Sequence, residues 1–173
     1  MEKVVEACRW FDLSDNFMFM NDDIFLLRDV LAGELPNYCS GQLIHPVPER
    51  IKQGTYYRSL QNTETALMGR GHETRHFDIH VPIIYNKRLF KDVMASYDWT
   101  IPGGYVVKSL YANTVSLPCV ELKDLKITRS LSVSQIRSAF KGRTFFSIGP
   151  KALNRNMKNL LKYGYPDKSR FEL

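Results

Sequence analysis

The sequence lacks several features that would assign it to a large class of proteins at once. No apolar run approaches the length of a membrane span, and the charged start Met1-Glu2-Lys3 is unlike a signal peptide. Of the 173 residues, 44% are hydrophobic and 24% are charged, an ordinary balance for one globular domain. We therefore expect a protein that is made and kept in the cytosol or nucleus.

Cysteine is scarce and irregularly spaced. Cys8, Cys39 and Cys119 are an odd number, and no two of them form a C-x-x-C pair. This pattern argues against a disulfide framework and against a zinc site built from cysteines. We expect three reduced thiols that pack as small hydrophobic side chains.

Acidic residues are missing between positions 130 and 166, and the net charge of +6 is unevenly spread. Residues 1–35 carry eight acidic against three basic residues, whereas residues 121–173 carry twelve basic against four acidic residues. An acidic beginning and a basic end suit a polyanionic partner at the basic end, or head-to-tail association between copies. A solubilising surface would also account for a net charge of this size.

Local patterns predict an α+β fold in a single domain, residues 1–173, with helices packed on an antiparallel β-sheet. Helices are expected over residues 21–32, 86–97, 133–141 and 150–163, from their caps, glycine stops and apolar spacing. Strands are expected over residues 55–60, 105–111, 120–127 and 144–148. Residues 1–20 are a candidate N-terminal arm, although Phe17–Met20 is interpreted as core, and residues 166–173 form a C-terminal tail.

One stretch has the letters of a catalytic motif. His72-Glu73-Thr74-Arg75-His76 reads H-E-x-x-H, which on a helix binds zinc through two imidazoles and uses the glutamate as general base. The residues that follow alternate, with Phe77, Ile79 and Val81 between polar positions, as in a half-buried strand. The context therefore predicts a strand, in which His72 and His76 are not stacked on one helical face.

This interpretation makes the motif accidental, so we predict no enzyme activity, no cofactor and no metal site. The alternative is a metal-dependent hydrolase that uses His72, Glu73 and His76. On a strand, His76, Asp78 and His80 would share one face, and a pH-sensitive polar face is a further alternative.

A basic amphipathic helix at the C-terminal end is the stronger indication of function. On a wheel of residues 151–162, four cations fall in one stripe, Lys151, Arg155, Lys158 and Lys162, opposite Leu153, Met157, Leu160 and Leu161. A second basic group precedes it, Arg137, Lys141 and Arg143. Phosphates of nucleic acid or of lipid headgroups are the natural counter-charges, and such contacts do not depend on base identity.

A short stretch carries a resemblance to a known family. Ser134–Phe140 followed by Phe145–Pro150 resembles the helix, strand and Gly-Pro turn near the end of the bornavirus-type matrix domain, over about a tenth of the chain. Size, basicity and layout also resemble the small matrix proteins of non-segmented negative-strand RNA viruses, such as plant rhabdoviruses. A P-P-x-Y budding motif, common in matrix proteins of animal viruses, is absent.

The resemblance implies a protein that assembles with itself, condenses the nucleocapsid and binds anionic membrane, in the cytoplasm, in the virion or at a host membrane. Together with the basic C-terminal third, it predicts a non-enzymatic structural protein whose partners are other copies, RNA or nucleoprotein, and anionic membrane. A sequence-independent RNA-binding regulator would use the same basic residues and stays open.

Overall fold

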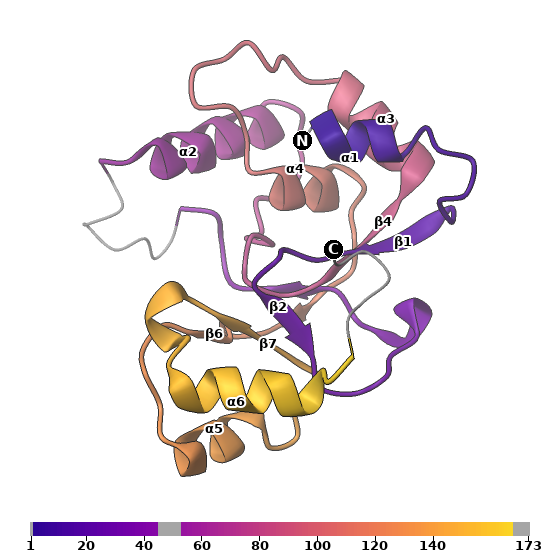
Figure 1. The fold of residues 1–173 in the computed structure, drawn as a ribbon. Helices are drawn as coiled ribbons and strands as arrows, with labels where there is room; N and C mark the ends of the chain where they lie inside the picture. Colours follow the sequence, from indigo (N-terminus) through magenta and orange to yellow (C-terminus); the bar gives the residue numbers. More distant parts are fainter. Residues whose placement is uncertain (1, 45–52, 168–173) are drawn as a thin grey trace. The chain divides into compact units, whose positions relative to one another are not determined.

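A computed structural model describes residues 2–44 and 53–167, whose contacts group into two compact units (Figure 1). Unit 1 comprises Met1–Met20 and Leu31–Asp124, and unit 2 comprises Asn21–Val30 and Leu125–Leu173. Helices and small sheets are mixed along the chain, so the α+β class is confirmed. The expectation of one antiparallel sheet is wrong, because the strands of the described residues form three small sheets. Whether both units belong to one domain stays a prediction.

Unit 1 has four α-helices and two two-stranded sheets among its described residues. The helices are α1 (Glu2–Ala7), α2 (Thr55–Met68), α3 (Lys87–Ala95) and α4 (Val107–Thr114), with a short 3-10 helix η1 (Ala32–Glu34). The strands are β1 (Asn16–Phe19), β3 (Tyr38–Cys39), β4 (Ile83–Asn86) and β5 (Val120–Glu121). β1 pairs antiparallel with β4, and β3 pairs parallel with β5.

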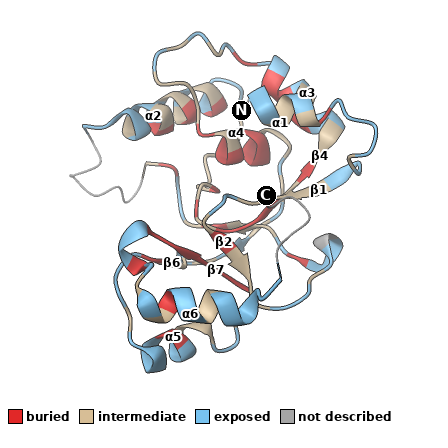
Figure 2. Cartoon of the chain, viewed as in Figure 1, coloured by how far each residue is buried: buried red, intermediate tan, exposed pale blue. Residues whose placement is uncertain are grey.

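The centre of unit 1 is helix α4, which is buried on every side from Lys108 to Asn113 (Figure 2). We expected a strand over residues 105–111, and this prediction is wrong. A helix that is covered all round has no face turned to solvent, so its sequence lacks the usual amphipathic period and reads like a buried strand.

An aromatic cluster packs beside α4. The ring of Tyr85 lies 4.5 Å from that of Phe90 and 4.8 Å from that of Tyr111, centroid to centroid. From strand β1, Phe17 and Phe19 pack on the same tyrosine at 5.8 and 5.6 Å. The interpretation of Phe17–Met20 as core is thus borne out for Phe17 and Phe19, which are partly buried and pack against the core of unit 1.

Helix α2 replaces the strand that we predicted over residues 55–60. Its polar side chains bind the Pro102–Gly104 turn, since Ser59 donates to the carbonyl of Gly103 at 2.6 Å and Asn62 donates to those of Pro102 and Gly104 at 3.1 and 3.0 Å. Aromatic and β-branched residues at its start suggested a strand, and these long-range contacts favour the helix instead. The helix predicted over residues 86–97 is confirmed as α3, with Asn86 as its N-cap.

Unit 2 contains one three-stranded sheet and two α-helices in its described part. The strands are β2 (Ile24–Leu26), β6 (Lys126–Ile127) and β7 (Phe145–Ile148), in the order β2-β7-β6, with β2 antiparallel and β6 parallel to β7. The helices are α5 (Val133–Phe140) and α6 (Arg155–Gly164), preceded by a 3-10 helix η3 (Pro150–Ala152). The strand expected over residues 144–148 and the capping box of the helix at Ser132 are confirmed.

The prediction of a helix over residues 21–32 is wrong. Three of its apolar residues, Ile24–Leu26, form strand β2, where Phe25 stacks on Phe146 of β7 at 5.2 Å and Ile24 is buried. A local cap signal at Asn21-Asp22-Asp23 was therefore overridden by pairing with a strand about 120 positions away.

Along residues 2–44 and 53–167, no helix is both long enough and apolar enough to cross a bilayer. Of the predicted C-terminal tail, only residues 166 and 167 lie within the described part of the chain.

Candidate functional site

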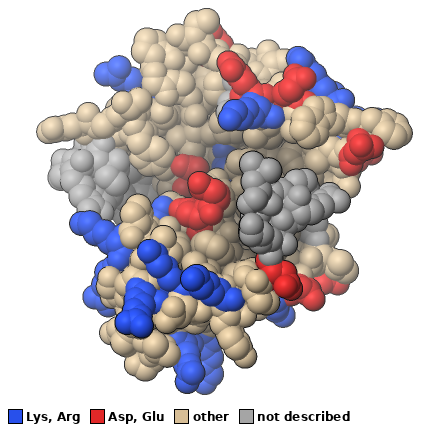
Figure 3. Space-filling model, viewed as in Figure 1, with Lys and Arg blue, Asp and Glu red and all other residues tan. Residues whose placement is uncertain are grey.

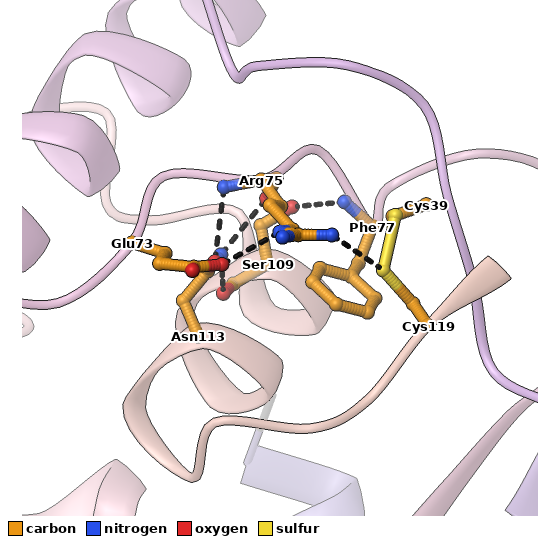
Figure 4. The surroundings of a disulfide bond; sticks show 7 residues. All are labelled: Cys39, Glu73, Arg75, Phe77, Ser109, Asn113 and Cys119. Carbon is orange, nitrogen blue, oxygen red and sulfur yellow. Dashed lines mark hydrogen bonds and ion pairs between the residues drawn. A yellow bond between two sulfur atoms is a disulfide. The ribbon is translucent and has the colours of Figure 1, made fainter. Parts of the chain in front are cut away.

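The H-E-x-x-H segment is not helical, as the alternating pattern predicted, and helix α4 explains why (Figure 4). The side-chain amide of Asn113 accepts a hydrogen bond from the N–H of Arg75 at 2.9 Å and donates one to its carbonyl at 2.8 Å. The hydroxyl of Ser109 accepts from the N–H of Phe77 at 2.9 Å. Polar side chains of a buried helix thus bind backbone groups that an α-helix over residues 72–82 would need for itself.

Lys108, the residue before Ser109 on α4, continues this pattern. Its ammonium group donates to the carbonyls of Ile79 at 3.2 Å and Val81 at 2.8 Å, and the side chain is only 4% exposed. Alternate residues of the segment therefore face α4, while His76, Asp78 and His80 are partly exposed. The alternation of buried and partly exposed residues is confirmed, but the predicted strand is wrong. Residues 76–82 form no strand, β4 begins only at Ile83, and the one bridge of the segment among the described residues joins Arg75 to Gln42.

The side chains of the motif do not come together. His72 and Glu73 line a polar cavity of about 420 Å³, whereas His76 lies beside Tyr56 of α2. Glu73 is ion-paired with Arg75 at 2.6 Å. In the portion of the chain that is described, no group of three His, Cys, Asp or Glu side chains is placed to hold a metal ion.

His76 belongs instead to a polar cluster in unit 1. The hydroxyl of Tyr56 donates to the carboxylate of Asp78 at 2.9 Å and lies 3.3 Å from Nε2 of His76. His80 Nδ1 lies 2.7 Å from Oδ2 of Asp124, whose other oxygen accepts from the backbone N–H of His80 at 3.3 Å. The sequence pattern predicted that His76, Asp78 and His80 share one face. It could not predict that Tyr56 and Asp124 join them, because both are distant in the sequence.

Burial changes the pKa of two members of this cluster, His76 and Tyr56. It lowers the pKa of His76, while the nearby Asp78 and Asp124 carboxylates act in the opposite direction. Burial also raises the pKa of Tyr56, and the adjacent Asp78 carboxylate adds to the effect. His76 is therefore neutral and Tyr56 protonated at neutral pH, which suits a hydrogen-bonded network.

The cysteines do not behave as three reduced thiols. Cys39 of β3 and Cys119, just before β5, form a disulfide with their Cα atoms 5.9 Å apart, and only Cys8 is free. The bond lies at the wall of the polar cavity, where Arg75 Nη1 contacts Cys119 Sγ at 3.8 Å (Figure 4). The odd cysteine count could not reveal a pair brought together by the parallel β3–β5 pairing.

This disulfide bears on the predicted location. Disulfides persist in oxidising surroundings, such as virions and cell surfaces, and are rare in the cytosol. The expectation of three reduced thiols, on which the cytosolic location partly rested, is therefore wrong, and the location stays a prediction.

The predicted phosphate-binding residues all lie in unit 2, and helix α6 has the expected two faces. Met157 is buried and Leu160 and Leu161 pack on the core, while Arg155, Lys158 and Lys162 are exposed at spacings of three and four. Two details are wrong: Lys151 and Leu153 are not on this helix, and Leu153, which was expected on its apolar side, is 42% exposed. Asn154 accepts a hydrogen bond from the N–H of Met157 at 2.9 Å and starts a new helix, which leaves Lys151 in η3.

The other three predicted cations are on or after α5. Arg137 lies in its last turn, Lys141 directly after it and Arg143 before β7; the first two are exposed and the third is half-buried. Within the described residues, none of the seven predicted side chains forms an ion pair or a hydrogen bond with another side chain. Figure 3 shows Lys and Arg side chains gathered over the part of the molecule where Figure 1 places α5 and α6.

The division into units separates the charges sharply. Unit 2 has twelve Lys and Arg against five Asp and Glu, a net charge of +7, whereas unit 1 has twelve against thirteen, a net charge of −1. Asp23, one of the five acids, pairs with Lys126 at 2.7 Å. The excess positive charge of the protein therefore belongs to unit 2.

Comparison with known proteins finds no family model and no curated protein that matches this chain. The resemblance to matrix proteins accordingly rests on the residues quoted for it alone.

Proposed function

We propose that the protein is a non-enzymatic, self-assembling structural protein of the matrix type, which binds RNA or nucleoprotein through the phosphate backbone. One observation carries this proposal: the seven cations, Arg137, Lys141, Arg143, Lys151, Arg155, Lys158 and Lys162, have no carboxylate partner among the described residues, in a unit of net charge +7. Phosphates supply the missing counter-charge, and their binding releases condensed counterions.

Spacing on α6 favours an extended polyanion over a small one. Arg155, Lys158 and Lys162 lie along one side of a ten-residue helix, and the opposite side is held by the buried Met157. A row of cations on a fixed element matches the repeated charges of a nucleic-acid backbone without reading its sequence. An anionic membrane presents similar charges, and a regulator that binds RNA without assembling would use the same row.

A neutralising variant tests the proposal. Arg155→Gln/Lys158→Gln/Lys162→Gln removes three phosphate contacts, so the slope of log K against log salt for a non-specific single-stranded RNA should become shallower by about 2. The matched control is Lys3→Gln/Arg88→Gln/Lys123→Gln, which removes the same charge from exposed positions of unit 1 and should leave the slope unchanged.

Equal slopes for the two variants would refute binding by α6. Vesicles with and without anionic lipid, tested with the same proteins, separate the membrane from RNA as the preferred polyanion. Sedimentation of the RNA-free protein separates the matrix type, which forms large species, from a regulator, which does not.

A further inference from the structure

An apolar groove runs between the two helices of unit 2. It has a volume of about 480 Å³ and is lined by Val133, Ile136 and Arg137 of α5 and by Leu160 and Tyr163 of α6, with two asparagines. Tyr163 is 90% exposed and Val133 is 47% exposed. We call it the α5–α6 groove. Its volume falls within the range of ~300–1,000 Å³ typical of binding pockets.

A pair of aromatic side chains projects from unit 1. Trp10 is 64% exposed and Phe11 is 97% exposed, in the turn that follows α1. The turn is fixed by backbone hydrogen bonds from Arg9 to Glu6 at 2.9 Å and from Trp10 to Ala7 at 3.0 Å. We call these two residues the aromatic tip. Aromatic side chains on a pre-ordered turn lose little entropy on binding and are the usual anchors of interfaces.

The two surfaces have opposite charge. Asp12 follows the tip directly, and residues 2–15 carry four acidic against two basic residues. The groove contains Arg137 and lies on helices that also carry Lys158 and Lys162, in a stretch without acidic residues from 125 to 166. Apolar area on both sides, with a negative rim facing a positive one, is the complementarity that selects a partner and its orientation.

We propose that the aromatic tip of one copy docks in the α5–α6 groove of a second copy. This inference rests on the self-assembly in the proposed function and names the surfaces that produce it. The two surfaces differ, so the contact is heterologous, and each copy that has used its tip still offers a groove. Such contacts extend into rings or open arrays, as a matrix layer requires.

Mixing two variants tests this arrangement without RNA. Trp10→Ser/Phe11→Ser removes the tip, and Val133→Ser/Tyr163→Ser removes the exposed groove walls. Each variant alone should be monomeric, with its self-association weakened at least about thirtyfold, as expected for loss of an anchor residue. An equimolar mixture should form dimers but nothing larger, because only one tip and one groove remain intact per pair.

Leu31→Ser/Met68→Ser is the matched control, because it removes two side chains that are 67% and 65% exposed outside both surfaces. It should assemble like the wild type. If the tip variant assembles like the wild type, or if the mixture stays monomeric while the wild type assembles, the docking proposal is wrong. If the wild type itself stays monomeric at all concentrations, the proposed self-assembly fails as well.

Fluorescence gives a second measurement that does not depend on disrupting the interface. Trp10 and Trp99 are the two tryptophans of the chain, so Trp99→Phe leaves Trp10 as the single reporter. Docking in the groove should shield Trp10 from acrylamide as the protein concentration rises, and Val133→Ser/Tyr163→Ser should abolish that shielding. Assembly that leaves Trp10 fully quenchable by acrylamide would overturn the proposal. RNA binding is measured separately for Trp10→Ser/Phe11→Ser. An unchanged salt slope for this variant shows that phosphate binding does not depend on docking.

Discussion

Reduction of the Cys39–Cys119 disulfide should destabilise unit 1 by a measurable amount. The bond joins residues 80 positions apart, and the chain-entropy relation for a loop of that length gives about 4.5 kcal/mol at 25 °C. Measured effects are usually smaller because reduced chains keep some structure, so we expect a loss of about 2–4 kcal/mol. With a urea dependence of about 2 kcal/mol per molar, the unfolding midpoint should fall by about 1–2 M.

Tryptophan fluorescence is the appropriate signal, because Trp10 and Trp99 both lie in unit 1 with the disulfide. Urea unfolding is measured with and without a phosphine reductant, which needs no mutation and leaves no cavity. The control is Cys39→Ala/Cys119→Ala, whose midpoint should not respond to the reductant. A thiol titration of the unreduced, denatured protein should find one reactive group, since Cys8 is the free cysteine. Three reactive thiols, or a wild-type midpoint that ignores the reductant, would refute the reasoning.

Two further predictions concern the segment that carries the motif. Burial holds the folded-state pKa of His76 below its ordinary value of 6.5, so the unfolded chain binds the proton first, and stability should fall as the pH drops below that value. Urea midpoints between about pH 7 and about pH 5 should show this loss in the wild type and less of it in His76→Gln; an equal loss in both would exclude His76 as its source. Asn113→Ala should cost about 2–4 kcal/mol in the free energy of unfolding, because it leaves the N–H and carbonyl of Arg75 without their partner. The exposed Asn159→Ala is its control, and a similar small effect of both substitutions would contradict the proposed role of α4.

Several signals that act over a few residues gave correct predictions. Asn86 caps α3, and the Ser132 capping box begins α5, because these bonds join neighbours in the sequence. The alternation from His76 to Val81 also predicted correctly that the H-E-x-x-H segment is not a helix. The two caps are decided by atoms that the local sequence already places together, and the alternation is a pattern that the sequence itself displays.

Features that depend on distant partners were missed. Helix α4 is buried all round, so it lacks the solvent-exposed polar face from which helices are recognised in a sequence. Residues 24–26 form a strand only because they pair with β7. Asp124 contacts His80, which lies 44 positions earlier in the sequence, and the disulfide joins two cysteines 80 positions apart. Polar residues in an otherwise apolar stretch, such as Lys108 of α4, indicate that buried hydrogen bonds are made there. The sequence does not indicate which backbone groups these side chains bind.

By itself, the sequence determined the α+β class, the caps of α3 and α5 and the segregation of charge, because composition and short-range bonding do not need a tertiary partner. Only the tertiary structure decided that the H-E-x-x-H segment is bound by side chains of α4, that two cysteines meet, and that Asn154 separates Lys151 from the cationic row of α6. The reason is the same in each case. A backbone group, a thiol or a helix start takes the partner that folding brings within hydrogen-bonding or bonding distance, and that partner is set by the packing of the whole unit.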